Sequence, residues 1–396
     1  MAPTQAQSTL KPEALLAQIS NLESVLADHA AQAEQDRKPV DEVMAAIEAT
    51  GVYRFFVPKR YGGYEFALDQ FLQVGITLGK GCISTAWATT FCVEHNWLLA
   101  QFGQACQDEI FGQQPYIIAP GTLAPKGSAT PAEGGYVVDG VWQWGTGIMH
   151  ADWVLVGALT LNQDTQQPDL LMCLIPKDEV CVLDTWYTSG MAGTGSNDIQ
   201  VDKVFVPSHR VQSLSEVSAQ KAPGVALHNS PTFRMPMAPL LSLTAAAPAV
   251  GGLKRAVELF RQRLQERTVY ASLEKQGERA VSQARLGHAA AATANAEQLL
   301  FSIAREVSAW GERDTPCPVE ERARLRLQIA HVVDLVKKTI QDVIAGSGAG
   351  AHMSDSPLQR IQRDINMLSC HTVFDLDIGG EQCGRTMIGL APNVPV

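Results

Sequence analysis

The densest grouping of aromatic and polar side chains in the sequence runs from 142 to 153 and reads Trp-Gln-Trp-Gly-Thr-Gly-Ile-Met-His-Ala-Asp-Trp. Aromatic faces can stack on a flat, π-rich ligand, and the hydroxyl and backbone N–H groups of a Gly-Thr-Gly corner can bond its ring heteroatoms. The segment therefore indicates a binding site for a flat ligand. A tryptophan-rich β core closed by an ordinary turn would have the same composition, so the rest of the chain must decide.

The chain has nine histidines, which are its candidate acid–base groups. A histidine whose pKa lies near neutral can take a proton from a phenol or an N–H group at pH 7. Apolar residues recur at helical spacing over 361–372, which predicts a helix that carries His371 on its flank. A satisfied structural histidine remains the alternative for each. The nine histidines form no His-x-x-x-His or His-x-x-Glu-His pair, so we expect no metal site.

Charge and composition exclude several kinds of partner. The 396-residue chain has a formal net charge of −10 and no long basic run, which argues against nucleic acid because phosphate binding needs clustered cations. No apolar stretch is long enough to predict a membrane span, and the first residues lack the features of a secretion signal. The eight cysteines include no Cys-x-x-Cys pair, so we expect reduced thiols and a cytoplasmic location.

Periodicity divides the chain into three zones. Helical spacing prevails over about 10–113, short β-type runs separated by turns over about 115–215, and long amphipathic helices over about 235–372. We predict an α+β, mainly helical fold with an N-terminal helical domain at 1–113, a central β-barrel or sandwich at 114–226 and a C-terminal helical bundle at 227–396. Because this is not a βαβ alternation, a Rossmann sheet is disfavoured, and the glycine-rich run at 346–351 is expected to end a helix.

Several short motifs follow one another in a fixed order along the chain. They are GVYRFFVP at 51–58, YGG at 61–63, CISTAW at 82–87, the Trp-rich segment at 142–153, GMAGTGSND at 190–198, FRMP at 233–236, DSPLQR with a following Arg-Asp pair at 355–364, and His371. This series resembles the reduced-flavin-dependent, two-component monooxygenases that have the acyl-CoA dehydrogenase fold and hydroxylate aromatic compounds. The resemblance implies that the C-terminal part is a four-helix bundle.

The resemblance places the flavin ring against the Trp-rich corner. Trp144 and Thr146 occupy the positions that meet the ring, with its pyrimidine side and N5 facing Thr146 and Gly147. The chemistry is reasonable, because a hydroxyl and a nearby N–H can serve N5 and the adjacent carbonyl while an indole packs on the ring.

Three further polar residues are implied to lie near the flavin. Thr194 and Ser196, in a glycine-rich loop, resemble the stretch along the flavin edge. Several relatives have a serine that bonds the flavin peroxide in the region where this chain has Thr122, which could replace it.

The remaining implied site residues are Arg234, His371 and His95. Arg234 matches an arginine that stabilises anionic reduced flavin, and the alternative is a structural arginine that bonds carbonyls at the domain junction. His371 stands where acyl-CoA dehydrogenases supply a catalytic glutamate and where the monooxygenases have a histidine. His95 is the candidate second substrate-binding histidine, with a core role as the alternative.

The resemblance therefore implies a homotetrameric oxygenase that takes reduced FMN, or reduced FAD, from a separate NAD(P)H-dependent reductase. Dioxygen would form a C4a-hydroperoxide on the flavin, and a phenolic, indolic or polycyclic aromatic substrate would be hydroxylated with His371 as base or hydrogen-bond partner. Three alternatives remain: an N-oxygenase acting on an amine or amino sugar, an acyl-CoA dehydrogenase, and a helical scaffold with no catalytic activity.

Overall fold

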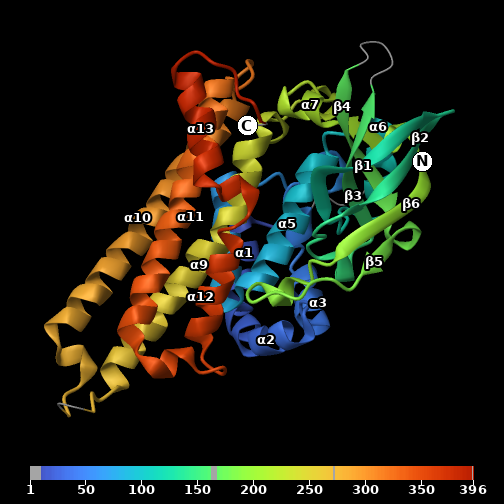
Figure 1. Cartoon of the computed structure of the whole chain (residues 1–396). Helices are drawn as coiled ribbons and strands as arrows, with labels where there is room; N and C mark the ends of the chain where they lie inside the picture. The colour runs from blue at the N-terminus through green and yellow to red at the C-terminus, as the bar shows by residue number, and fades with distance from the viewer. Residues whose placement is uncertain (1–9, 162–166, 271–272, 395) are drawn as a thin grey trace.

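The computed structural model describes residues 10–161, 167–270, 273–394 and 396, and it has the predicted order of helices, strands and helices (Figure 1). The mainly helical α+β fold class is thereby confirmed. The helices before the first strand are α1 (Pro12–Asn21), α2 (Glu23–Asp36), α3 (Asp41–Ala49), α4 (Leu68–Gly81), α5 (Ile83–Leu99) and α6 (Gln104–Phe111).

The strands of the described residues form one mixed sheet in the order β5-β6-β2-β1-β3-β4-β7. Strands β1 and β3 pair in parallel, and the other neighbours are antiparallel. The barrel or sandwich detail is not confirmed, because β5 and β7 are the two edges of a single sheet. The strands are β1 (Gly121–Ala132), β2 (Gly135–Trp142), β3 (Trp153–Leu161), β4 (Pro168–Pro176), β5 (Cys181–Leu183), β6 (Asp198–Pro207) and β7 (Val211–Ser213).

Long helices follow the sheet and pack beside one another (Figure 1). In α11 the apolar residues from Leu325 to Val343 that recur at helical spacing are buried, because the stripe faces the other helices. The glycine-rich run ends α11 as predicted, since the helix stops at Ser347 and Gly348 has a φ of +70°. The helices after the sheet are α7 (Leu214–Ser218), α8 (Pro223–His228), α9 (Met237–Glu266), α10 (Ala280–Gly311), α11 (Val319–Ser347), α12 (Pro357–Leu368) and α13 (Leu376–Met387).

Helix α5 is the element that joins the three parts of the fold. It contacts β1 on one side and α9 and α12 on the other, so it lies between the sheet and the C-terminal helices (Figure 1). Every residue of α5 except Phe91 is buried. Side chains on different faces of this helix can therefore reach both the sheet and the bundle.

Short 3-10 helices lie in the connections that matter for the site. They are η5 (Ala192–Thr194) before β6, η7 (Pro231–Arg234) before α9 and η10 (Thr372–Phe374) between α12 and α13. Among the described helices, none combines the length and the apolar character that crossing a membrane requires.

Candidate functional site

The Trp-rich corner contains one core tryptophan and one exposed tryptophan. Trp142 is fully buried and its indole N–H donates to the carbonyl of Gly157 at 2.7 Å, so it belongs to the core of the sheet. Trp144 meets Trp186 edge to face, with ring centroids 6.0 Å apart, and is still 54% exposed. Gly147, at φ +83°, packs against α5, because a Cβ there would lie 3.0 Å from Sγ of Cys92. The alternative of a tryptophan-rich β core therefore holds for Trp142 but not for Trp144.

Three hydroxyl groups form a chain beside this corner. Thr194 Oγ1 lies 2.9 Å from the Met191 carbonyl oxygen, Ser196 Oγ lies 2.7 Å from Thr194 Oγ1, and Thr146 Oγ1 lies 2.8 Å from Ser196 Oγ. A carbonyl can only accept, so Thr194 donates to it; Ser196 then donates to Thr194, and Thr146 donates to Ser196. Each hydroxyl has one proton, so Thr146 is left with lone pairs only. Its remaining capacity is to accept a hydrogen bond from a ligand.

A buried carboxylate holds the loop that carries this chain. Oδ1 of Asp364 accepts the backbone N–H of Met191 at 2.6 Å, and its Oδ2 lies 3.5 Å from the Ser84 hydroxyl. The neighbouring Arg363 donates to the carbonyl of Ser189 in the same loop at 2.6 Å. Burial raises the pKa of Asp364 to about 6, and the N–H of Met191 opposes this rise without cancelling it.

The raised pKa of Asp364 predicts a pH-dependent cost to folding. The folded chain binds this proton more tightly than the unfolded chain, so the carboxyl favours folding least when it is ionised, and stability falls as pH rises through about 6. Asp364→Asn keeps the acceptor for Met191 but cannot ionise. When the pH is raised from 5 to 7.5, we therefore expect its free energy of unfolding to rise by about 1–2 kcal/mol relative to that of the wild type. Urea unfolding at the two pH values measures this difference. An equal pH dependence in both proteins would contradict it, and Asp375→Asn, at the start of α13, is the control.

The prediction that His371 lies on the flank of a helix is wrong. Helix α12 ends at Leu368, and His371 is the residue before η10. The physical reason is local, because Ser369 Oγ and Cys370 Sγ both donate to the carbonyl of Asn366, at 2.7 and 3.3 Å, and so compete with the helical ladder. The turn, rather than the helix face, directs the imidazole.

The environment of His371 makes it a neutral hydrogen-bond donor. Its Nδ1 accepts the backbone N–H of Val373 in a long contact of 3.4 Å, so Nε2 carries the proton of the neutral ring. Burial, with a smaller effect of the nearby Arg326 guanidinium, lowers the pKa of His371 to about 4. At pH 7 the imidazole therefore presents an N–H.

His95 has the complementary arrangement. Its Nδ1 lies 2.7 Å from the carbonyl oxygen of Ala119, which can only accept, so Nδ1 carries the proton and Nε2 keeps a lone pair. Burial lowers the pKa of His95 to about 4. The strand β1 leaves room for the ring at Gly121, where a Cβ would lie 2.9 Å from Cε1 of the imidazole.

Phe91 lies between the two histidines. Its ring centroid is 5.8 Å from that of His95 and 5.8 Å from that of His371, and Trp87, one turn earlier, lies 5.6 Å from His371. Helix α5 thus brings the two imidazoles together through one face, while Cys92 packs against the corner. A donor and an acceptor flank an aromatic surface, which is an arrangement suited to a planar substrate with a hydroxyl or N–H group.

Thr122 is buried on β1, and its hydroxyl has no hydrogen-bond partner among the described residues. Successive residues of a strand point to opposite faces, so Thr122 points away from the side on which Gly121 meets His95. A role for Thr122 beside the flavin stays a prediction, and this orientation does not support it.

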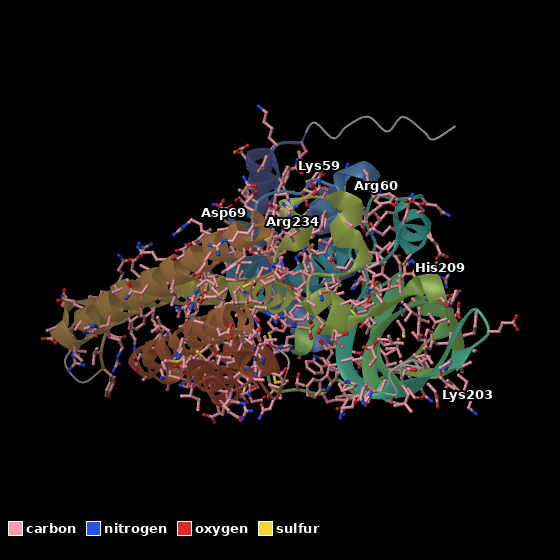
Figure 2. All side chains as sticks on the ribbon, turned by 90° about the horizontal axis from the view of Figure 1, so that it is seen from above. Lys59, Arg60, Asp69, Lys203, His209 and Arg234 are labelled. Atoms are coloured by element: carbon pink, nitrogen blue, oxygen red, sulfur yellow. The ribbon has the colours of Figure 1, made fainter. Side chains whose placement is uncertain are left out.

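Arg234 lies in η7 and bonds groups of its own surroundings. Its Nε donates to the carbonyl of Gly311 at 3.0 Å, and its Nη1 lies 3.2 Å from Oδ1 of Asn229. The indole of Trp97, toward the far end of α5 from Trp87, donates to the neighbouring carbonyl of Thr232. Figure 2 places Arg234 on the helical side of the molecule, in the region that also carries Lys59 and Asp69. Its role toward reduced flavin stays a prediction.

Sequence reasoning missed two carboxyl groups of this region. Asp364 belongs to one of the motifs, but nothing in the sequence pairs it with Met191, which is 173 residues away. Glu94 precedes His95, and the sequence alone assigns it no role. Its spacing from Trp87 and Phe91, seven and three residues, is the helical signal that could have placed it on their face.

Comparison with known proteins identifies relatives over nearly the whole chain. Residues 243–376 match the family model described as acyl-CoA dehydrogenase, C-terminal domain. A pigment production hydroxylase of Rhodococcus sp. is 34% identical over 382 residues, which cover 96% of this chain and 98% of that protein. The flavin-dependent monooxygenase, oxygenase subunit HsaA, of Mycobacterium tuberculosis is 31% identical over 383 residues, covering 96% of this chain and 97% of the relative.

A solved structure has the same fold from end to end. The structure of XiaF from Streptomyces sp. in complex with FADH2 and glycerol superposes with a TM-score of 0.90 at 29% sequence identity, and the match covers 97% of each chain. The resemblance found in the motif series thus extends to the whole architecture.

Proposed function

We infer that this chain is the oxygenase component of a two-component aromatic hydroxylase, because it belongs to the flavin-dependent monooxygenases of the acyl-CoA dehydrogenase fold. Its reaction inserts one atom of O2 into an aromatic substrate and releases the other as water. A separate NAD(P)H-dependent reductase supplies the reduced flavin that this reaction consumes.

The residues of the corner fit a reduced flavin ring. Reduced flavin, when bound, supplies the two electrons that activate O2. Thr146 can only accept a hydrogen bond from a ligand, and reduced flavin carries an N–H at N5 that oxidised flavin lacks. We propose Trp144, Thr146 and Gly147 as the surface that meets the ring, with Thr194 and Ser196 behind them, and FMN as the preferred flavin.

The paired histidines support aromatic hydroxylation. The lone pair on Nε2 of His95 can accept a hydrogen bond from a phenol or ring N–H, which makes the ring richer in electrons. The N–H of His371 can donate to the same oxygen and hold the ring on Phe91. The single observation that carries the proposal is this complementary pair, with its two rings on either side of one aromatic side chain.

An acyl-CoA dehydrogenase needs a carboxylate base where this chain has 369–373. That segment contains none, and the nearest acid, Asp375, accepts the backbone N–H of Ile378 at 2.8 Å to cap α13. We expect that adding acyl-CoA to the protein with oxidised flavin under anaerobic conditions leaves the flavin oxidised.

Mixing the anaerobic protein with reduced flavin and then with oxygenated buffer tests the proposal. We expect the absorbance of oxidised flavin to return more slowly than in free solution, because the site excludes water, and a phenol or indole added beforehand to leave as its hydroxylated product. The experiment is run with reduced FMN and with reduced FAD. Oxidation at the rate of free flavin, with no product from phenols, indoles or amines, would contradict the function; product from amines alone would favour the N-oxygenase.

The assembly and location belong to the same proposal. We propose a homotetramer, which light scattering of the purified protein measures. All eight cysteines are free thiols in the structure, which supports a reducing compartment such as the cytoplasm.

A further inference from the structure

Glu94 occupies the substrate-facing side of α5. It follows Trp87 by seven residues and Phe91 by three, so the three side chains share one helical face. Phe91 and Trp87 both contact the ring of His371. Glu94 therefore extends the face of α5 that carries Trp87 and Phe91 by about 5 Å along the helix, next to His95, since each residue advances about 1.5 Å.

One carboxyl oxygen of Glu94 has no hydrogen-bond partner among the described residues. The side chain is 1% exposed, and its Oε2 has no hydrogen bond within the described ranges 10–161, 167–270 and 273–394. No ion pair of Glu94 with a Lys, Arg or His side chain is found among those residues. Burial raises the pKa of Glu94 well above its ordinary value, so the group is held as a neutral acid.

An unpaired buried carboxyl is costly, and a core position would be filled better by leucine or glutamine. Such a group persists where a ligand completes its hydrogen bonds. A ligand hydroxyl can bond the neutral acid, and a ligand ammonium can pair with the ionised one. A ligand carboxylate would instead bring an ionised group into this buried position, where no cation among the described residues pairs with Glu94 to offset the cost of desolvation.

We propose that Glu94 determines substrate specificity by binding a hydroxyl or amine substituent of the aromatic substrate, so that aromatic acids are poor substrates. This inference rests on the proposed function, because it uses the surface between His95 and His371 as the place of the substrate ring. It adds that the substrate has a second polar group, besides the hydroxyl that the histidines bind.

Four phenols of equal length test the inference: tyrosol, tyramine, para-propylphenol and para-hydroxyphenylacetate. They end in a hydroxyl, an ammonium, a methyl and a carboxylate group. In the wild type with reduced flavin we expect the kcat/KM of tyrosol or tyramine to exceed that of the other two by about 10-fold or more, chiefly through KM. In Glu94→Leu this preference is lost and para-propylphenol improves, whereas Glu94→Gln keeps the preference for tyrosol.

Two measurements that do not depend on turnover accompany the series. The infrared band of a protonated carboxyl, absent from Glu94→Gln, shifts when tyrosol is added to the wild type. Glu94→Leu folds and raises the Tm by about 1–3 °C, because it removes an unsatisfied polar group. Glu297→Gln, which loses only its pair with Lys254, is the matched control and leaves the substrate ranking unchanged.

The outcomes separate the inference from the proposed function. The inference is overturned and the function stands if the wild type hydroxylates phenols but has the same order of kcat/KM for the four phenols as Glu94→Leu. The same holds if the infrared band does not shift when tyrosol is added. If para-hydroxyphenylacetate is the preferred phenol, the inference is likewise overturned. If no phenol is hydroxylated by any of the proteins, both fail together.

Discussion

His95→Ala is expected to lower the yield of hydroxylated product per reduced flavin by about 100-fold or more, while O2 consumption continues. The reason is that Nε2 of His95 offers the free acceptor for the proton of the substrate, since Nδ1 is committed to the carbonyl of Ala119. Without it the aromatic ring is less nucleophilic, and activated oxygen is lost as hydrogen peroxide. Product and peroxide are both measured in single-turnover reactions with a fixed amount of reduced flavin.

The same experiment separates the roles of the two histidines. If His371 donates its Nε2–H, then His371→Gln, whose amide also donates, retains product yield, and His371→Ala loses it. If His371 acts instead as the base, glutamine cannot replace it and both variants lose product to a similar degree. His209→Ala is the control, because His209 pairs with Glu109 and, as Figure 2 shows, lies at the sheet.

A normal product yield from His95→Ala would show that the reaction does not need His95. His371 would then be the remaining candidate for the group that accepts from the substrate. Binding of reduced flavin is measured alongside, because the two imidazoles are assigned to the substrate and not to the ring. A loss of flavin binding in either alanine variant would therefore contradict the division of roles.

The order of helices, strands and helices could be predicted because periodicity is a local property. The helix over α11 and the termination at Gly348 follow from spacing and from one residue type. The closure of the sheet could not be predicted, because strand pairing depends on contacts between distant segments. Runs of β-type residues are compatible with a barrel, a sandwich or the single sheet that is observed.

The sequence could predict which residues belong to the candidate site, but not their tautomers or the directions of their hydrogen bonds. Motif order drew attention to Thr146, Ser196 and Thr194, but which hydroxyl donates is set by the Met191 carbonyl, and that contact exists only in the folded chain. In the same way, the sequence shows His371 but not the turn in which the Val373 N–H bonds Nδ1 and leaves the ring proton on Nε2. Tautomers and proton directions are properties of tertiary contacts, so no spacing rule can supply them.

The hydroxyl chain predicts that this protein discriminates between the redox states of flavin. Thr146 donates to Ser196, so its free lone pairs favour the N–H at N5 of reduced flavin and repel the lone pair at N5 of oxidised flavin. A mismatch of one buried hydrogen bond is worth about 10- to 100-fold in affinity. We therefore expect the wild type to bind reduced flavin at least about 10-fold more tightly than oxidised flavin.

Ser196→Ala frees the Thr146 hydroxyl to rotate and donate, so the variant binds oxidised flavin more tightly. The ratio of its affinity for reduced flavin to its affinity for oxidised flavin therefore falls by about 10-fold. For a two-electron couple that change lowers the potential of the bound flavin by about 30 mV. Thr194→Val breaks the chain one step earlier and has a smaller effect, because the Ser196 proton is then no longer directed. Thr293→Val is the matched control, since that threonine also donates to a carbonyl but lies on α10. An equal affinity ratio in the wild type and in Ser196→Ala would show that the direction of the hydrogen bonds between the three hydroxyls does not affect flavin binding.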